Sequence, residues 1–200
     1  LRPSGQSGLL TISLDAFAEY QRGRAWTWEH QALIRARMVT GGESLRQGFS
    51  HLRREVLTRL RRRDELREEV RRMRERMRRE LGSSRAGEFN IKQDRGGIAD
   101  IEFMVQYGTL AGAERNPGIL RYTDNIRLLD ELERAGELTT EQARVLADAY
   151  RHYRGMVHRL TLQEQSARVS EASVEGSRAA VIDVWNTVME PGSDTNAEES

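Results

Sequence analysis

The sequence contains no cysteine and only three prolines among its 200 residues. Without cysteine there is no disulfide framework and no thiolate metal site, so we expect a cytoplasmic protein. No apolar run approaches the roughly 20 residues that a membrane span needs, and no signal-peptide core is visible. We therefore expect no contact with a membrane.

An excess of charge of one sign is also missing. The 32 basic and 31 acidic residues leave a formal net charge of +1, which gives no bulk attraction to nucleic acid. The run from Arg61 to Glu80 is rich in arginine, but acids are interleaved throughout it, with Glu68–Arg72 and Glu75–Arg79 four residues apart. A solvated, self-paired helix face is therefore a better interpretation than an RNA-binding surface.

Lysine is almost absent, because Lys92 is the only lysine among the 32 basic residues. It is followed by Arg95, Gly96 and Gly97 and then by an apolar-periodic run. A lysine is a compact point charge, and a site that prefers it often contacts a phosphate or carboxylate. The segment predicts a basic, glycine-hinged loop before a helix whose first backbone N–H groups are free for an anion. On composition alone, a charged turn that contains one lysine by chance is an equally good interpretation of this segment.

Helical signals cover most of the remaining chain, and few breakers interrupt them. The expected helices cover residues 14–22, 28–39, 44 to at least 56, 64–81, 98–112, 124–135, 139–165 and 173–190. Apolar positions three or four residues apart define their buried faces. Ser13, a Ser44–Gln47 box, Thr123 or Asp124, and a Thr139–Gln142 box supply N-terminal caps. We predict an all-α helical bundle with a short irregular or extended start and no internal repeat.

Two further segments contain side chains suited to binding a phosphate. Arg2, Ser4 and Gly5 lie in a Pro/Gly/Ser-rich start, where glycine lets backbone N–H groups approach a ligand, although a plain surface turn is the simpler interpretation. Farther along, Trp28 and Arg35 share one helix face, although tryptophans in such a segment are also typical core anchors.

Asp100 and Glu102 are the candidate metal ligands, since Mg²⁺ prefers carboxylates together with water and phosphate oxygens. Residues two apart on a helix do not share a face, however. First-turn acids also stabilise a helix dipole, and that explanation is at least as good for Asp100. His152 and His158 do not share a face either, so we predict no zinc site.

Four ordered motifs give the chain a resemblance to a known family. They are Leu1 to Gly8 (LRPSGQSG), Ala25 to Arg37 (AWTWEHQALIRAR), Arg95 to Phe103 (RGGIADIEF) and Thr123 to Leu129 (TDNIRLL). Over roughly residues 1–190 the chain closely resembles the bacterial glutamine synthetase adenylyltransferases, also called glutamate–ammonia-ligase adenylyltransferases.

The resemblance implies a division of the chain. Each half of these enzymes is a nucleotidyltransferase domain followed by a helical domain; one half adenylylates glutamine synthetase, and the other removes AMP by phosphorolysis. Residues 1–23 would then be a remnant of the nucleotidyltransferase domain with its connecting helix, and 24–190 the helical domain. Residues 191–200 are polar and acidic, which predicts a disordered tail. The first two motifs resemble the C-terminal, adenylylating half more closely.

The resemblance also implies the chemistry of the site, with ATP as substrate and Mg²⁺ held by three aspartates. It places those aspartates before Leu1, so no catalytic residue is expected within the chain, and the fragment alone is expected to be inactive. Roles in the nucleotide site would fall to Arg2, Ser4, Gly5 and Arg35. Lys92, Arg95, Gly96 and Gly97 would reach toward the ATP phosphates or the acceptor tyrosine site. Asp100 and Glu102 would hold the glycine loop or assist a metal.

The implied partners are glutamine synthetase, the PII signal protein and glutamine as effector. Two alternatives stay open at this point. The chain could belong to the deadenylylating half, or it could be a non-catalytic helical module whose Arg/Glu helix docks a partner.

Overall fold

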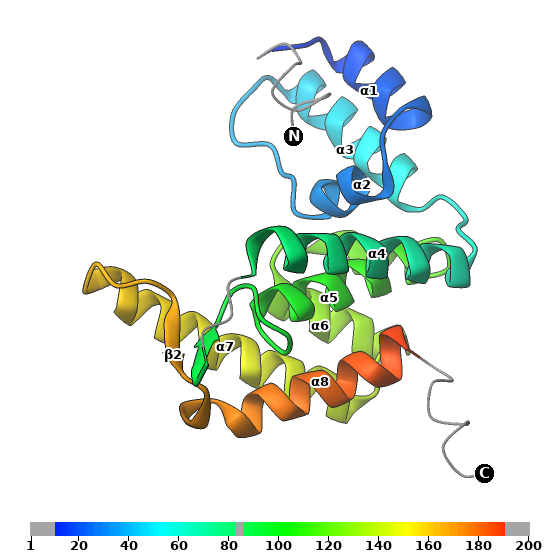
Figure 1. Cartoon of the computed structure of the whole chain (residues 1–200). Helices are drawn as coiled ribbons and strands as arrows, with labels where there is room; N and C mark the ends of the chain where they lie inside the picture. The colour runs from blue at the N-terminus through cyan, green and yellow to red at the C-terminus, as the bar shows by residue number, and fades with distance from the viewer. Residues whose placement is uncertain (1–10, 83–85, 191–200) are drawn as a thin grey trace, which may run out of the picture. The chain divides into compact units, whose positions relative to one another are not determined.

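The computed structural model describes residues 11–82 and 86–190, and these are mainly α-helical (Figure 1). In chain order the elements are α1 (Leu14–Gly23), α2 (Thr27–Ile34), α3 (Glu43–Leu57), α4 (Arg63–Leu81), β1 (Glu88–Asn90), α5 (Ile98–Gly112), the 3-10 helix η2 (Pro117–Arg121), α6 (Asn125–Arg134), α7 (Thr140–Leu162), β2 (Arg168–Ser170), the 3-10 helix η3 (Glu171–Ser173) and α8 (Glu175–Met189). The all-α prediction is confirmed. No described helix is both long enough and apolar enough to span a membrane.

The chain divides into two compact units, each made of two segments. Unit 1 comprises Leu1–Val70 and Gln106–Glu137, and unit 2 comprises Arg71–Val105 and Leu138–Ser200. The predicted division into residues 1–23, 24–190 and 191–200 stays a prediction, and residues 1–10 and 191–200 lie outside the described residues.

In unit 1, α1 and α2 pack on α3, and η2 packs on α3 and α6. Helix α2 ends at Ile34, earlier than the predicted Val39. The reason is Arg53 of α3, whose guanidinium donates hydrogen bonds to the carbonyls of Leu33 and Ile34 and to that of Leu120 in η2. These carbonyls are thereby satisfied without a further helical turn.

Most predicted caps are present because a cap depends on a few neighbouring residues. Ser13 accepts from the backbone N–H of Ala16, Asp124 caps α6, and Thr139 forms the expected box at α7. The Ser44 box is wrong, because the N-cap residue of α3 is Gly42, two residues earlier.

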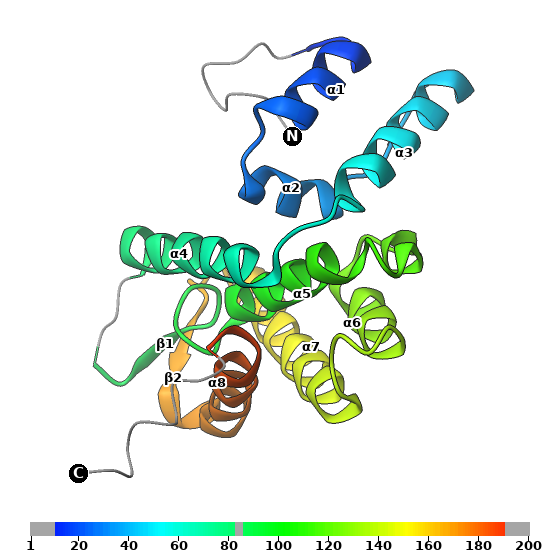
Figure 2. The same cartoon turned by 90° about the vertical axis from the view of Figure 1, so that its right-hand side faces the viewer.

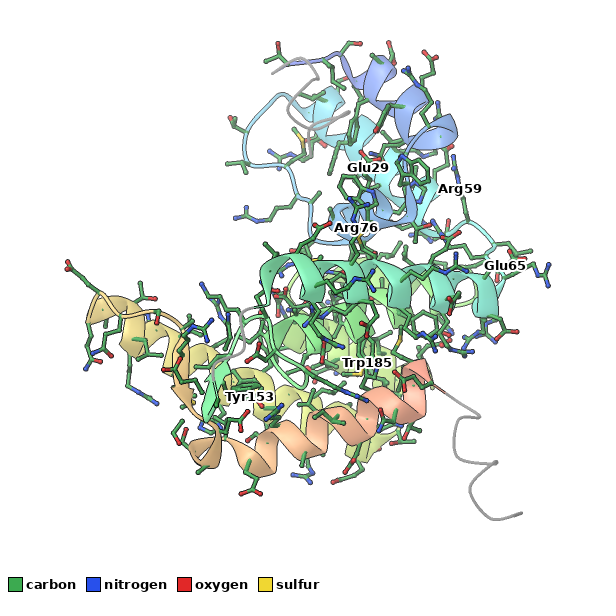
Figure 3. The ribbon with its side chains drawn as sticks, in the orientation of Figure 1. Glu29, Arg59, Glu65, Arg76, Tyr153 and Trp185 are labelled. Carbon is green, nitrogen blue, oxygen red and sulfur yellow. The ribbon has the colours of Figure 1, made fainter. Side chains whose placement is uncertain are left out.

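In unit 2, α7 packs against α8, and β1 pairs with β2 in an antiparallel register that sets Phe89 opposite Val169. The second view shows the two strands again side by side (Figure 2). Tyr153 of α7 and Trp185 of α8 point into the core of this unit (Figure 3). The sequence reasoning missed both strands, because three residues each are too few to show an alternating pattern.

The charged face of α4 is self-paired, as predicted for a solvated helix. Arg76 pairs with Glu80 at 2.8 Å, and Arg67 pairs with Asp64 at 2.9 Å. Glu75 pairs with Arg78 at 2.8 Å, a different partner from the predicted Arg79.

Candidate functional site

The segment around Lys92 forms a compact turn between β1 and α5 in unit 2. The Asn90 side-chain oxygen accepts hydrogen bonds from the backbone N–H groups of Lys92 and Gln93 at 3.1 and 3.3 Å. The Asp94 carboxylate in turn accepts from the Asn90 N–H at 2.7 Å. Short polar side chains that bond the nearby backbone are typical of tight turns, so this turn has a defined shape without a ligand.

The N-terminus of α5 is closed by the same turn. Gly97 N–H donates to the Asp94 carbonyl, Ile98 N–H to the Ile91 carbonyl, and Ala99 N–H to the Lys92 carbonyl. The expectation of free backbone N–H groups for an anion is therefore wrong. The chain folds back over the start of its own helix, and its carbonyls take the donors that a helix otherwise leaves open.

Both glycines are required by close packing in this turn. Gly96 has a φ of +84°, and a Cβ there would lie 2.8 Å from the Arg178 carbonyl oxygen of α8. A Cβ on Gly97 would lie 2.6 Å from the Ile91 carbonyl oxygen. Both residues are buried. They allow neighbouring backbone to approach closely, and they do not form an exposed hinge.

Asp100 is fully buried and has a donor at each carboxylate oxygen. Its Oδ1 lies 2.6 Å from Arg74 Nε and 3.2 Å from Arg78 Nη2, and its Oδ2 accepts the Gly96 N–H at 2.7 Å. Burial lowers the pKa of Arg74, and the charge of Asp100 opposes that shift. Two roles were expected for Asp100, holding the glycine loop and assisting a metal, and these bonds favour the first.

Glu102 lies on the same helix but has a different environment. It is partly buried and accepts a hydrogen bond from the Tyr150 hydroxyl at 3.4 Å. Within the described parts of the chain, no group of three or more His, Cys, Asp or Glu side chains could hold a metal ion. A metal role for Asp100 and Glu102 stays a prediction.

The two cations of the turn are on its solvent side. Lys92 and Arg95 are both exposed. Arg95 Nη2 donates to the Asn186 side-chain oxygen of α8 at 2.9 Å, and its carbonyl accepts from Arg178 Nε at 3.1 Å. The result is a rigid backbone that presents two positive side chains to solvent, an arrangement suited to an anionic ligand.

The other predicted contacts fall elsewhere. Arg2, Ser4 and Gly5 lie outside the described residues. Arg35 belongs to unit 1, where it is the exposed C-cap residue of α2. Its role as a nucleotide contact stays a prediction.

Other side chains of the Ala25–Arg37 motif also lie in unit 1. Gln31 is buried and donates to Gln106 at 3.0 Å. Trp26 and Trp28 are 68% and 44% exposed, so the interpretation of these tryptophans as core anchors is wrong.

Arg74 is the residue that the sequence reasoning missed. It was grouped with the solvated arginines of the charged helix, yet it is fully buried. Its position carried a signal, because it follows Val70 by four residues and precedes Met77 by three. It therefore shares the apolar face of α4.

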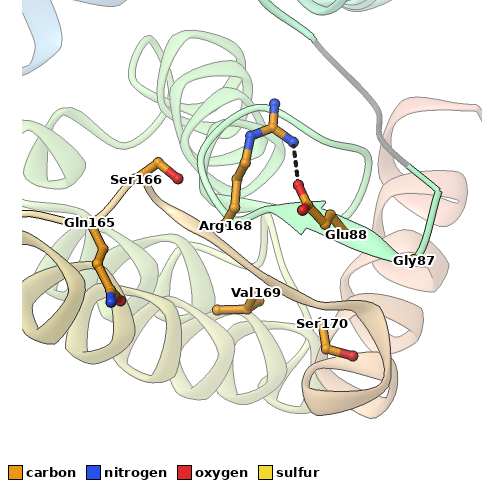
Figure 4. Close-up of a pocket in the computed structure, with 7 residues that line it drawn as sticks. All are labelled: Gly87, Glu88, Gln165, Ser166, Arg168, Val169 and Ser170. Carbon is orange, nitrogen blue, oxygen red and sulfur yellow. Dashed lines mark ion pairs between the residues drawn. The ribbon is translucent and has the colours of Figure 1, made fainter.

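Unit 2 also holds an open pocket of about 490 Å³ beside the strand pair (Figure 4). Its lining consists of Gly87, Glu88, Gln165, Ser166, Arg168, Val169 and Ser170. Arg168 and Glu88 face each other across the two strands at 3.5 Å, which neutralises the charge at this site. The pocket depends on the strand register and was not predictable from local sequence.

Comparison with known proteins assigns the family. A family model described as glutamate-ammonia ligase adenylyltransferase matches residues 1–52, and one described as GlnD PII-uridylyltransferase matches residues 64–170, more than half of the chain. The chain is 52% identical over 190 residues to the bifunctional glutamine synthetase adenylyltransferase/adenylyl-removing enzyme of Nitrosococcus oceani, 54% over 192 residues to that of Thioalkalivibrio sulfidiphilus, and 47% over 204 residues to that of Acinetobacter baylyi. The chain belongs to the glutamine synthetase adenylyltransferase family. The resemblance stated from the four motifs is confirmed.

The alignments cover 95 to 100% of this chain but only 20 to 22% of these adenylyltransferases, so the chain spans about a fifth of their length. The relatives' names combine adenylyl transfer and adenylyl removal. Family membership alone therefore does not assign the chain to one half. The match over residues 64–170 includes the Lys92 turn, Arg74 and Asp100, and both strands.

Proposed function

We propose that this chain is the helical part of the adenylylating half of a glutamine synthetase adenylyltransferase. In the complete reaction, a tyrosine oxygen of glutamine synthetase bonds to the α-phosphorus of ATP, the bond to the bridging oxygen breaks, and pyrophosphate leaves. The observation that carries the proposal is the hydrogen-bonded turn that presents Lys92 and Arg95, in a chain whose relatives are named for adenylyl transfer and adenylyl removal. The Trp26–Leu33 motif supports the adenylylating half.

The role proposed for the turn is electrostatic. Nucleotidyl transfer moves negative charge onto the leaving pyrophosphate, and cations held in place stabilise that charge without reorganising. Lys92 and Arg95 supply such cations on the solvent side of the turn. Gly96 and Gly97 allow the backbone to take this shape.

The proposed metal chemistry belongs to Mg²⁺ bound outside the Lys92 turn. Asp100 does not fit a primary metal ligand in this conformation, because N–H donors occupy both of its oxygens. We therefore propose that the described residues do not hold the metal by themselves. Measurable AMP transfer from Mg-ATP to glutamine synthetase by a polypeptide of residues 1–200 would refute this.

The test of the function uses Lys92→Ala in the intact enzyme that carries this chain. AMP transfer from Mg-ATP and phosphate-dependent AMP removal are measured separately. We expect the KM for ATP in transfer to rise about tenfold, the scale of one charged hydrogen bond, with removal unchanged. Arg144→Ala is the control, because Arg144 is an exposed α7 cation with only surface partners. Loss confined to AMP removal would instead assign the chain to the deadenylylating half.

The proposed partners follow from the resemblance: glutamine synthetase as protein substrate, and PII and glutamine as regulators, in the cytoplasm. The docking-module alternative is tested by binding. Tight binding of glutamine synthetase or PII without nucleotide, combined with normal kinetics of the Lys92→Ala enzyme, would favour that alternative.

A further inference from the structure

The buried Arg74–Asp100 ion pair holds the Lys92 turn at two points within unit 2. Arg74 Nη2 donates to the Gln93 carbonyl at 2.6 Å, while Asp100 Oδ2 accepts the Gly96 N–H at 2.7 Å. The pair itself closes at 2.6 Å between Arg74 Nε and Asp100 Oδ1. Lys92 directly precedes the first held residue, and Arg95 directly precedes the second.

Stability alone does not account for this arrangement. Neither side chain of the pair is exposed, and removing two charges from water is costly even when they pair. Arg74 Nη1 is also buried without a hydrogen-bond partner among the residues that the structure describes. An apolar pair of similar volume would often be neutral or more stable. What an apolar pair cannot do is fix the Gln93 carbonyl and the Gly96 amide.

We propose that Arg74 and Asp100 are positioning residues that hold the Gln93–Gly96 turn in the geometry in which Lys92 and Arg95 meet the anionic nucleotide. This inference rests on the proposed function. It assigns to Arg74 a role that depends on its planar fork. One nitrogen bonds the carboxylate and another bonds the turn, which a lysine ammonium cannot reproduce with the same geometry.

The surroundings keep the fork in place. The Arg74 guanidinium lies over the Phe103 ring of α5, 5.9 Å from its centroid. Arg78, one turn farther along α4, also reaches Asp100. On its other side the turn rests on α8, through the Arg178 bond to the Arg95 carbonyl. The charge pair is therefore one part of a larger support. Its removal also removes the contacts to Phe103 and Arg78, whereas the Arg178 bond to the Arg95 carbonyl does not depend on it.

The test compares two variants of the Arg74–Asp100 pair, called the brace below, in the intact enzyme. Arg74→Met combined with Asp100→Leu removes both loop contacts and replaces the two charged side chains by apolar ones, with the branching of the side chain kept at residue 100. Arg74→Lys keeps the charge but loses the fork, and covers the case in which the double variant fails to fold. Amide hydrogen exchange of the peptide spanning residues 92–97 reports on the turn directly. We expect exchange there to rise about tenfold or more in both variants. The double variant loses the acceptor of the Gly96 N–H, and both variants lose the bond to the Gln93 carbonyl that keeps the turn closed.

A double-mutant cycle with Lys92→Ala then separates positioning from general stability. If the brace positions Lys92, the roughly tenfold effect of Lys92→Ala on the KM for ATP falls to about threefold or less in a brace-variant background. Glu137→Gln is the matched control, because Glu137 is a buried carboxylate that pairs with Arg63 and Arg115 in unit 1. In that background the full effect of Lys92→Ala should remain.

The possible outcomes each bear on the inference. Unchanged exchange over residues 92–97 would overturn the brace, and raised exchange with additive kinetics would overturn the positioning role. If Lys92→Ala has no effect in the otherwise normal enzyme, the proposed function fails, and the exchange measurement alone then decides whether the brace exists.

Discussion

Arg74 and Asp100 form a fully buried ion pair, with Nε 2.6 Å from Oδ1, on two helices that flank the Lys92 turn. The arginines of α4 are therefore not equivalent. Arg67 and Arg76, for example, pair with acids on the same helix near its surface, where an ion pair contributes little to stability. Arg74 instead acts on the backbone of a distant turn, so its substitution should change the shape of the turn more than the charge of the surface.

His30 should make the stability of unit 1 depend on pH. It is buried, with Nε2 3.2 Å from the Gln21 carbonyl oxygen and Nδ1 3.4 Å from Arg61, partners that suit a neutral ring protonated at Nε2. Burial, aided by the positive charge of Arg61, lowers its pKa below the ordinary 6.5. The unfolded chain therefore binds more protons, and the free energy of unfolding should fall as the pH drops below 6.5. Urea unfolding of the normal protein and of His30→Gln, between about pH 8 and about pH 5.5, should show a flatter dependence for the variant.

Arg53 should contribute far more to stability than its neighbour Arg54. Arg53 donates to the Leu33, Ile34 and Leu120 carbonyls, whereas Arg54 is exposed. We expect Arg53→Met to lower the free energy of unfolding by about 2 kcal/mol, the scale of charged hydrogen bonds. Arg54→Met should stay within about 0.5 kcal/mol of the normal protein, as is usual for a surface substitution. Equal effects of the two substitutions in urea unfolding would contradict the role given to Arg53 at the end of α2.

Alanine substitutions at Gly96 and Gly87 should separate two ways in which an added side chain lowers the free energy of unfolding. Both have positive φ, +84° and +76°, but only at Gly96 would a Cβ meet neighbouring atoms, at 2.8 Å from Arg178. Gly87→Ala should therefore lose about 1 kcal/mol from backbone strain alone. Gly96→Ala should lose more, about 2–3 kcal/mol, because overpacking adds to the strain. Thermal unfolding of both variants measures the difference, and a smaller loss at Gly96 would contradict the packing against α8.

Tyr153 and Tyr20 should respond in opposite directions to the same change. Burial raises the pKa of Tyr153 to about 12, and its hydroxyl has no hydrogen-bond partner among the described residues. Tyr153→Phe removes an unsatisfied group and should raise the free energy of unfolding by up to about 1 kcal/mol. The Tyr20 hydroxyl donates to Glu29 at 2.9 Å, so Tyr20→Phe should lower it by about 2 kcal/mol. Urea unfolding of both variants checks the signs.

The helices were largely predictable from the sequence because their signals are local. Ser13, Asp124 and Thr139 cap helices through residues three positions away, and apolar spacing fixed the extent of α5. The end of a helix was not predictable where a residue far away in the sequence determines it. Helix α2 stops early because of Arg53, which lies on another helix.

The charged residues of the candidate site were predictable from the sequence, but the buried contacts that hold its backbone were not. The exposure of Lys92 and Arg95 follows from their polarity and from the turn residues around them. The closed start of α5 does not, because it depends on the Ile91 and Lys92 carbonyls folding back. The burial of Arg74 could have been inferred from its position on the apolar face, but its bond to the Gln93 carbonyl required the tertiary structure.

The pairing of Phe89 with Val169 also sets an order of assembly. Contacts between segments far apart in sequence form late, because the chain must first lose the conformational entropy of the long loop that they close. During synthesis the stretch around Lys92 leaves the ribosome well before β2 and α8, which complete its surroundings. The cationic turn should therefore gain its two bonds to α8, from Arg95 to Asn186 and from Arg178 to the Arg95 carbonyl, only when this part of the chain is finished.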